Sequence, residues 1–513
     1  MEVVKDILKV EEQKGYEQIE TLIETEIYLN QTKPDIDTIL WADGKVEILS
    51  TKIIRDKILV NGLVKFKLVY KSNEEQLNIY TLEANSDFRE EIEIDGITEE
   101  MVGEVSSNLE YIEYEQEDER KVSLRALVNI LGRVYAINTA EIIKDIKEGV
   151  NLQVLKEKIQ YNDILGREES HALIKDAFEV GEDQPSIEEI LKIDLHPYEK
   201  EYSISADRII LSGVVESSII YFGGNKLNSV KREIPFTHFI DIEDIQPDSK
   251  CEIDMDVADG EYQLKESLEG DLRIIDLEAK LKFSAKLYDN REKEVIVDAY
   301  STSNQLNLQT EEIAIIENIK DIVVREEISK DLSGKGFQEI YAIEGETSII
   351  DHQYVEDKIM AEGILTLNIY YLEEDTDSIG TLKEEIPFKS YITTEELQKG
   401  VVINIKTNLE ELDYGLREDV LSIKASIKNH IFINRERKIT IVSQIEETDE
   451  LIDKKNRPSI IIYMVQKDDS LWDIAKRYNT TVEEIVLANN VISPNTLMPG
   501  EKIIIEKKVD INF

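Results

Sequence analysis

Apolar and polar residues alternate along much of this chain, which is the pattern of half-buried β-strands. Three stretches with this period occupy residues 122–126, 277–287 and 421–428, and a fourth occupies residues 364–369. A period of two places one face of a strand against a core and the other in water. Lysines on the solvent-exposed face of residues 277–287 and 421–428 disfavour pairing between strand edges. The pattern therefore predicts a mainly β protein of antiparallel strands.

One stretch of this pattern occurs three times with the same spacing. In each copy a glycine follows an aspartate by six residues, a tyrosine follows that glycine by eight, and the copies begin 151 and 150 residues apart. An isoleucine lies seventeen residues before each aspartate, and a phenylalanine follows each tyrosine. A common register of this kind implies one domain copied three times. The repeated residues are Ile39, Asp56, Gly62, Tyr70 and Phe88; Ile190, Asp207, Gly213, Tyr221 and Phe236; and Ile340, Asp357, Gly363, Tyr371 and Phe388.

These repeated residues predict local structure. Each aspartate precedes a strand-like run, so we expect a turn there, and each glycine is expected where a strand bends, bulges or approaches another backbone closely. A role for the aspartates in metal binding or acid–base chemistry is the alternative, but the three copies share no accompanying histidine or second fixed carboxylate. The segment that opens each copy is expected to begin as a strand and to continue as either a strand or a short helix. These segments are 8–29, 152–180 and 308–332. Short capped helices are expected at 98–104 and 393–398.

The chain thus divides into five parts. We expect three tandem antiparallel β-sandwich-like repeats at residues 1–150, 151–303 and 304–445. A polar segment at 446–459 predicts a linker, and residues 460–508 form a unit of a different kind. With 513 residues and 41% hydrophobic content, units of this size can each bury a core.

Composition narrows the classes of function and partner. Lysine and arginine total 60 against 108 aspartate and glutamate, a formal charge of −48. Such a surface repels nucleic acid and anionic lipid, so neither is an expected partner. The single cysteine, Cys251, excludes an intramolecular disulfide and has no histidine within motif reach. The N-terminal residues lack the features of a secretion signal, and no apolar run is long enough to span a membrane. We expect a cytoplasmic protein.

The C-terminal unit has a readable βααβ order. Residues 461–465 predict a strand, Leu471 and Val482 begin two amphipathic helices, and residues 502–505 predict a second strand after the Pro499-Gly500 turn. The order Tyr-x-Val, Ser-Leu-Trp-x-Ile-Ala-x-x-Tyr, Ile-x-x-Ala-Asn and Leu-x-Pro-Gly-x-x-Ile-x-Ile runs through the whole unit. In this order and spacing the unit resembles the LysM domain.

The LysM resemblance implies a shallow groove that binds N-acetylglucosamine-containing glycans such as peptidoglycan. Asp468-Asp469 replaces the usual Gly-Asp pair and adds a negative charge at the groove edge, which leaves room for a protein ligand instead. Trp472 is interpreted as a core residue rather than a sugar platform, because it shares a helix face with Ala475. With Ile474 it completes the expected partner surface. The two loops that would line the groove supply Lys467, Asp468, Asp469 and Ser470 on one side, and Asn495, Thr496, Leu497 and Met498 on the other.

The acidic β repeats ahead of a LysM domain resemble SPOCS domains, and the whole arrangement is similar to the SipL-like family of spore coat morphogenetic proteins. That resemblance implies a non-enzymatic scaffold in the mother-cell cytoplasm at the forespore surface, within the spore coat. It further implies recruitment through the LysM domain by the coat ATPase, stage IV sporulation protein A, and contacts with other coat proteins. A cell-wall protein that uses the LysM groove for peptidoglycan is the alternative.

An enzyme is not expected from the residues themselves. A zinc amidase needs clustered histidines, and the five in this chain are scattered, with none at metal-ligand spacing. A glycosidase needs two carboxylates, but 108 acidic residues make any pairing uninformative. We therefore predict no catalytic residues, no metal and no cofactor. The histidines are His171, His196, His238, His352 and His430.

Overall fold

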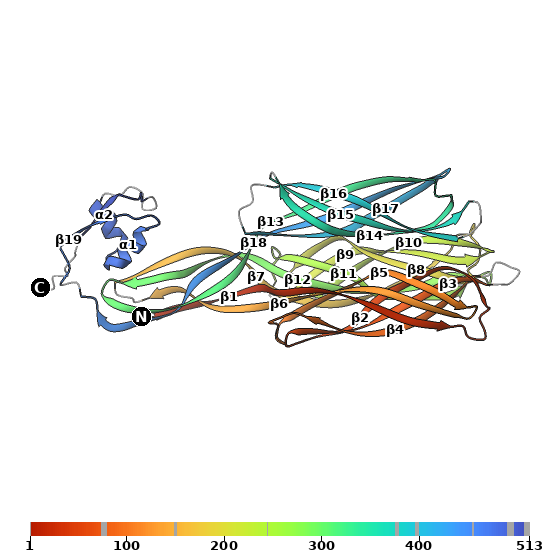
Figure 1. Cartoon of the computed structure of the whole chain (residues 1–513), viewed down its shortest axis with the longest axis horizontal. Coiled ribbons are helices and arrows are strands. Elements are labelled where there is room, and N and C mark those ends of the chain that lie inside the picture. The colour runs from red at the N-terminus through yellow and green to blue at the C-terminus, as the bar shows by residue number, and fades with distance from the viewer. Residues whose placement is uncertain are drawn as a thin grey trace.

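The protein is almost entirely β (Figure 1). The computed structural model describes residues 2–72, 79–147, 151–243, 245–355, 357–374, 379–394, 400–453, 456–489 and 497–506. The strands of the first repeat are β1 (Glu2–Tyr28), β2 (Ile36–Ile54), β3 (Lys57–Ser72), β4 (Ile79–Glu93), β5 (Val102–Asp118) and β6 (Lys121–Lys147). Those of the second are β7 (Leu152–Glu179), β8 (Glu189–Ser205), β9 (Arg208–Gly223), β10 (Lys226–Asp241), β11 (Lys250–Glu266) and β12 (Leu272–Ser301).

The third repeat has the same order of elements. Its strands are β13 (Asn304–Ser333), β14 (Phe337–Val355), β15 (Lys358–Glu373), β16 (Ile379–Thr393), β17 (Val401–Arg417) and β18 (Val420–Leu451). The C-terminal unit is β19 (Ile460–Met464), α1 (Leu471–Tyr478), α2 (Val482–Asn489) and β20 (Lys502–Glu506). The predicted βααβ order is confirmed. β18 continues to Leu451, so strand pairing extends into the segment expected to be a linker.

Each repeat pairs two three-stranded antiparallel sheets, which confirms the predicted sandwich-like class. In the first repeat the sheet orders are β1-β6-β5 and β2-β3-β4, and the other two repeats follow the same plan. Each sandwich has its own apolar core between the sheets. The segments that open the repeats are single long strands with no helix. The helix expected at 98–104 is wrong, because β5 already begins at Val102 after a turn. The one expected at 393–398 falls mostly outside the described residues, and Thr393 ends β16.

The repeated residues do in the structure what their spacing predicted. Asp56, Asp207 and Asp357 all lie in hairpin turns with φ between 60° and 62°. Each glycine lies beside a bulge of the neighbouring strand, as the shift between Ile48 and Ser50 opposite Gly62 shows. On its other side each glycine pairs with the repeated phenylalanine. That ring covers the glycine so closely that an added Cβ would lie 2.2–2.6 Å from it.

The strands β1 and β6 and their counterparts in the other repeats extend beyond the sandwiches and form a narrow stalk, seen at the left of the repeats in Figure 1. We define the stalk as residues 2–13 with 135–147, 152–164 with 288–301, and 304–318 with 434–451. A bulge marks the start of the stalk in all three strand pairs, at Gln13, Leu287 and Asn318. Apolar residues from all three repeats share one core along it, including Val10, Ile159 and Ile315. The shared core of the stalk therefore connects the three repeats to one another.

The three sandwiches also contact one another in a ring. Lys45 of the first repeat donates a hydrogen bond of 2.7 Å to the Val257 carbonyl of the second. At the matching position, Nε2 of His196 in the second lies 3.2 Å from the Leu409 carbonyl oxygen of the third. Lys383 of the third closes the ring on the first repeat, 3.5 Å from a carbonyl oxygen of β5. The repeats therefore surround a pseudo-threefold axis.

One buried lysine and three partly buried carboxylates lie where the three repeats meet, and we call them the axial cluster. Asp43, Asp194 and Glu344 each lie thirteen residues before the turn aspartate of their repeat. Lys192 is the cluster's lysine; it is 7% exposed, forms an ion pair with Asp43, and lies 3.2 Å from Glu344. Tyr370 donates a hydrogen bond of 3.4 Å to Glu344. The axial cluster thus contains one lysine and three carboxylates, so the lysine can neutralise only part of their negative charge.

Candidate functional site

The C-terminal unit carries the candidate site, and two of the predicted groove residues hold its first loop together. The Asp469 carboxylate accepts hydrogen bonds of 2.7 Å from the Tyr463 hydroxyl and from the Gln466 amide. These bonds hold the pKa of Asp469 below its ordinary value. Ser470 caps α1 in a capping box with Asp473, each side chain accepting from the other's backbone amide. Asp469 and Ser470 therefore shape the loop more than they present groups to a ligand.

Lys467 and Asp468 form the outward-facing part of this loop. Both side chains are exposed, and Asp468 has φ of 69°. That conformation favours glycine, which explains physically why a glycine is usual at this point. Here the position carries a carboxylate beside an ammonium group. A short loop with one positive and one negative side chain can bind amide and hydroxyl groups as well as a charged protein surface.

The opposite loop is only partly described. Asn495 and Thr496 lie outside the described residues. Leu497 packs against the core of the unit, while the Met498 side chain is 72% exposed. The described part of the predicted groove therefore brings Met498 and the exposed loop of Lys467 to the surface. An apolar side chain next to charged groups is the kind of lining that a sugar ring or a protein side chain can use.

The remaining two predicted residues, Trp472 and Ile474, have other roles. Ile474 is fully buried in the core of the unit, so it supports the surface from below. Trp472 faces the stalk: its indole Nε1 donates a hydrogen bond of 2.8 Å to Asp298 of β12. Its ring meets that of Tyr300 edge-on, with centroids 4.9 Å apart. The interpretation of Trp472 as a residue of the unit's own core alone therefore misses a contact with the second repeat.

This contact between the C-terminal unit and the stalk has further members. Lys476 lies 2.6 and 2.7 Å from the two carboxylate oxygens of Asp298. The Tyr300 hydroxyl donates a hydrogen bond of 2.8 Å to the Thr480 carbonyl. Tyr300 is only 5% exposed and belongs to the unit's apolar core cluster. No sequence pattern indicated that residues 174 to 180 positions apart would meet here.

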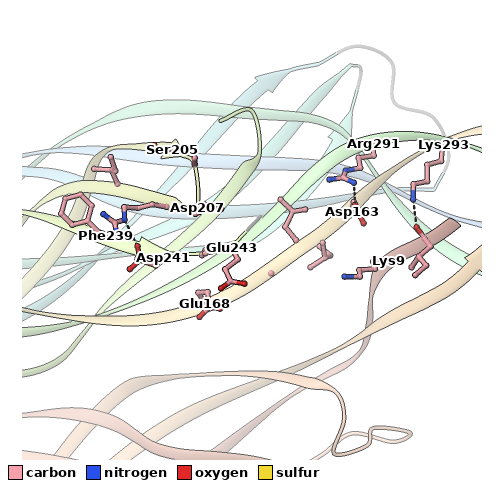
Figure 2. Close-up of a pocket in the computed structure, with 18 of the residues that line it drawn as sticks. Lys9, Asp163, Glu168, Ser205, Asp207, Phe239, Asp241, Glu243, Arg291 and Lys293 are labelled. Atoms are coloured by element: carbon pink, nitrogen blue, oxygen red, sulfur yellow. Dashed lines mark hydrogen bonds and ion pairs between the residues drawn. The ribbon is translucent and has the colours of Figure 1, made fainter. Parts of the chain in front are cut away.

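A surface groove of about 1260 Å³ lies elsewhere, where the second repeat joins the stalk (Figure 2). Its basic side chains are largely paired: Lys293 with Asp6 at 3.1 Å, Arg291 with Asp163 at 3.1 Å, and Arg208 with Asp241 at 2.6 Å. Figure 2 shows Asp241 at the left and the pair of Arg291 and Asp163 at the right, with Glu168 and Glu243 between them. This groove has the character of an ion-paired seam between repeats.

One pair of side chains resembles part of a hydrolase site. The Ser170 hydroxyl lies 2.9 Å from Nε2 of His238, which stacks on the Phe283 ring at 4.5 Å. Burial lowers the pKa of His238, and Asp241 opposes that shift. Within the described residues no carboxylate accepts a hydrogen bond from the other ring nitrogen. Nor do those residues contain a group of three or more potential metal ligands arranged around one point.

Comparison with known families matches both parts of this architecture. The SipL, SPOCS domain family model matches residues 35–117, 186–265 and 337–417, and the LysM domain model matches residues 463–506. This chain carries three SPOCS domains of the SipL type followed by a LysM domain. Each SPOCS match spans four strands, from β2 to β5 and their counterparts, so the stalk strands lie outside the matched ranges. The SipL match implies association with the spore coat, and SPOCS and LysM domains are typically non-catalytic binding or scaffold domains.

One curated relative shares a short segment with this chain. "SpoIVD-associated factor A" of Bacillus subtilis (strain 168) is 51% identical over 43 residues, which is 8% of this chain and 11% of the relative. The chain therefore matches about a tenth of that protein's length. No solved structure matches this chain. In the part of the chain that the structure describes, no helix has the length and apolar character needed to cross a bilayer.

Proposed function

We propose that this protein is a non-enzymatic spore coat morphogenetic scaffold. In this proposal its LysM domain binds the coat ATPase, stage IV sporulation protein A, and so recruits the protein to the forespore surface in the mother-cell cytoplasm. The observation that carries the proposal is the combination of three SPOCS domains around one axis with a single LysM domain at the end of their shared stalk. Three similar surfaces on one body can hold several coat subunits, and linked weak contacts gain strength through effective concentration.

The proposed partner surface of the LysM domain is the exposed loop of Lys467 and Asp468 together with Met498. A charge-reversing Lys467→Glu substitution should weaken capture of the purified ATPase by the full-length protein. Lys280→Glu makes the same charge change at an exposed position of β12 in the second repeat and serves as the matched control. If both variants and the wild type capture the same amount of ATPase, the Lys467 loop is not part of the partner surface.

Binding of peptidoglycan in the same LysM groove is the second candidate, because the SPOCS domains by themselves do not decide what the LysM domain binds. Full-length protein should be incubated in parallel with purified cell wall and with the ATPase. Retention on the ATPase but not in the wall pellet supports the scaffold. The reverse result would support the wall-binding function, and retention on neither would exclude both.

A further inference from the structure

The LysM face that contacts the stalk is built to receive a particular pair of side chains. Asp298 and Tyr300 are two positions apart on β12, so both project from the same side of the strand. Asp298 accepts from two donors of α1, the Trp472 indole and the Lys476 ammonium group, at 2.6–2.8 Å. Tyr300 packs into the apolar core of the LysM domain, and its hydroxyl donates a hydrogen bond to the Thr480 carbonyl. The Asp298 carboxylate and the Tyr300 ring therefore each have a defined binding position on the LysM domain.

Only the second repeat offers that pair. The stalk core contains matching residues from each repeat: Ile143 and Ile146, Ile296 and Ala299, and Val442 and Ile445. Counting two and four residues from the first member of each pair gives Asp145 and Lys147 in the first repeat, Asp298 and Tyr300 in the second, and Gln444 and Glu446 in the third. The carboxylate with an aromatic ring thus occurs once among the three equivalent strand ends.

We propose that this face of the LysM domain is a docking site for the Asp298-Ala299-Tyr300 strand end of the same chain, which holds the domain in one orientation on the stalk. The covalent connection comes from the third repeat, since β18 ends at Leu451 and β19 begins at Ile460. The docking contact comes from the second repeat. Two attachments on different strands fix an orientation that a single eight-residue connection leaves free.

The proposal has a consequence for partner binding, which rests on the proposed function. With the Trp472 face occupied, an external partner meets the docked domain through the side that carries Lys467, Asp468 and Met498. Trp472 is then a docking residue and is unavailable as a sugar platform. The stalk, in turn, presents the LysM loop to the forespore surface with a defined direction.

The test uses the full chain and two readouts of docking. Trypsin has cleavage sites in the connecting segment at Lys454 and Lys455. Acrylamide quenching of fluorescence reports on Trp472, because the other tryptophan, Trp41, is only 4% exposed. Losing a charge-assisted hydrogen bond shifts such an equilibrium by about tenfold or more. Asp298→Asn and Tyr300→Ala should therefore each raise the trypsin cleavage rate by about tenfold and increase quenching.

Matched variants separate docking from general loss of structure. Asp145→Asn is the same substitution at the equivalent position of the first repeat, and it should leave both readouts unchanged. Lys476→Gln removes the partner from the LysM side; combined with Asp298→Asn it should add little, because the two residues share one contact. Wild-type rates in both the Asp298→Asn and Lys476→Gln variants would overturn the proposal. Protection that falls on dilution, together with a dimer in light scattering, would overturn it by placing the strand end in a second copy.

Discussion

Glu344 of the axial cluster gives the most direct test of how the three repeats are held together. Its side chain is 16% exposed and lies between Lys192 of the second repeat and Tyr370 of its own. Burial raises the pKa of Glu344 from 4.5 to about 7; Lys192 opposes that shift and the negative charge of Asp194 adds to it. At this site the one lysine cannot compensate three ionised carboxylates.

The sign of the effect on stability follows from linkage. A raised pKa means that the folded state binds the proton more tightly than the unfolded state does, so the stabilisation is complete below pH 4.5 and is lost as the pH rises through 7. A shift from 4.5 to about 7 corresponds to an upper limit of about 3 kcal/mol, at 1.36 kcal/mol for each pH unit. The repeats should therefore separate more easily at pH 8 than at pH 5.

Glu344→Gln imitates the protonated acid and removes the titration. The variant should unfold at the same urea concentration as the wild type at pH 5 and at a higher concentration at pH 8. Trp41 is a suitable probe, since its ring lies 5.6 Å from that of Tyr370 beside the cluster. Glu346→Gln, an exposed glutamate two positions further along β14, is the control for a lost surface charge.

Comparison of the wild type with Glu344→Gln isolates the axial cluster, because these two proteins share every other titrating group. If Glu344→Gln keeps the full wild-type loss of stability between pH 5 and 8, the raised pKa does not control the contact. If it is less stable than the wild type at pH 8, the ionised carboxylate contributes more through Lys192 than it costs through burial, and the reasoning is refuted.

Three further predictions concern the repeats themselves. Gly363→Ala should lower the free energy of unfolding by at least about 2 kcal/mol, because the new Cβ would lie 2.6 Å from a backbone oxygen and 2.4 Å from the covering phenylalanine ring, whereas Gly415→Ala has open space and should be nearly neutral in the same urea titration. Arg167→Leu should destabilise the protein by about 3 kcal/mol or more at pH 7, because Glu11, 5% exposed, loses one of the two cations that hold its pKa below the ordinary value against the effect of burial; the loss should shrink toward pH 3 in thermal unfolding. Cys251 should resist a thiol reagent at pH 8 until the protein is denatured, since burial raises its pKa to about 12, and rapid labelling of native protein would contradict this.

The repeat unit could be predicted from sequence because its signals are local. Asp56 and its two counterparts mark turns, and the period of two along the following strands specifies which residues are buried. The sequence distinguishes Ile39 only by its fixed offset from Asp56, and the structure explains that offset, since Ile39 pairs directly with Tyr70. The expected helix at 98–104 is wrong because the pairing of β5 with β6, which begins at Val102, outweighs the helix propensity of so short a segment.

What lies between the repeats could not be predicted in the same way. Lys192 lies in a strand that carries ordinary alternation, and nothing in its neighbours indicates two carboxylates from other repeats. Asp298 and Tyr300 are likewise unremarkable along β12, and their role depends on a domain about 174 residues further on. Such contacts are set by how three sandwiches close around an axis, which a single repeat's pattern does not contain.

The stalk and the axial cluster together explain why three repeats on one chain differ from three identical subunits. In a symmetric trimer every position at the axis carries the same residue three times, so a lysine there would face two others. On one chain, the equivalent positions can hold Trp41, Lys192 and Ala342, which fill the axis with a ring, a charge and a methyl group. The same freedom places a carboxylate and an aromatic ring at one strand end of the stalk and leaves the others without them. Covalent linkage of the repeats thus permits one buried lysine and one LysM domain in a body that otherwise has threefold form.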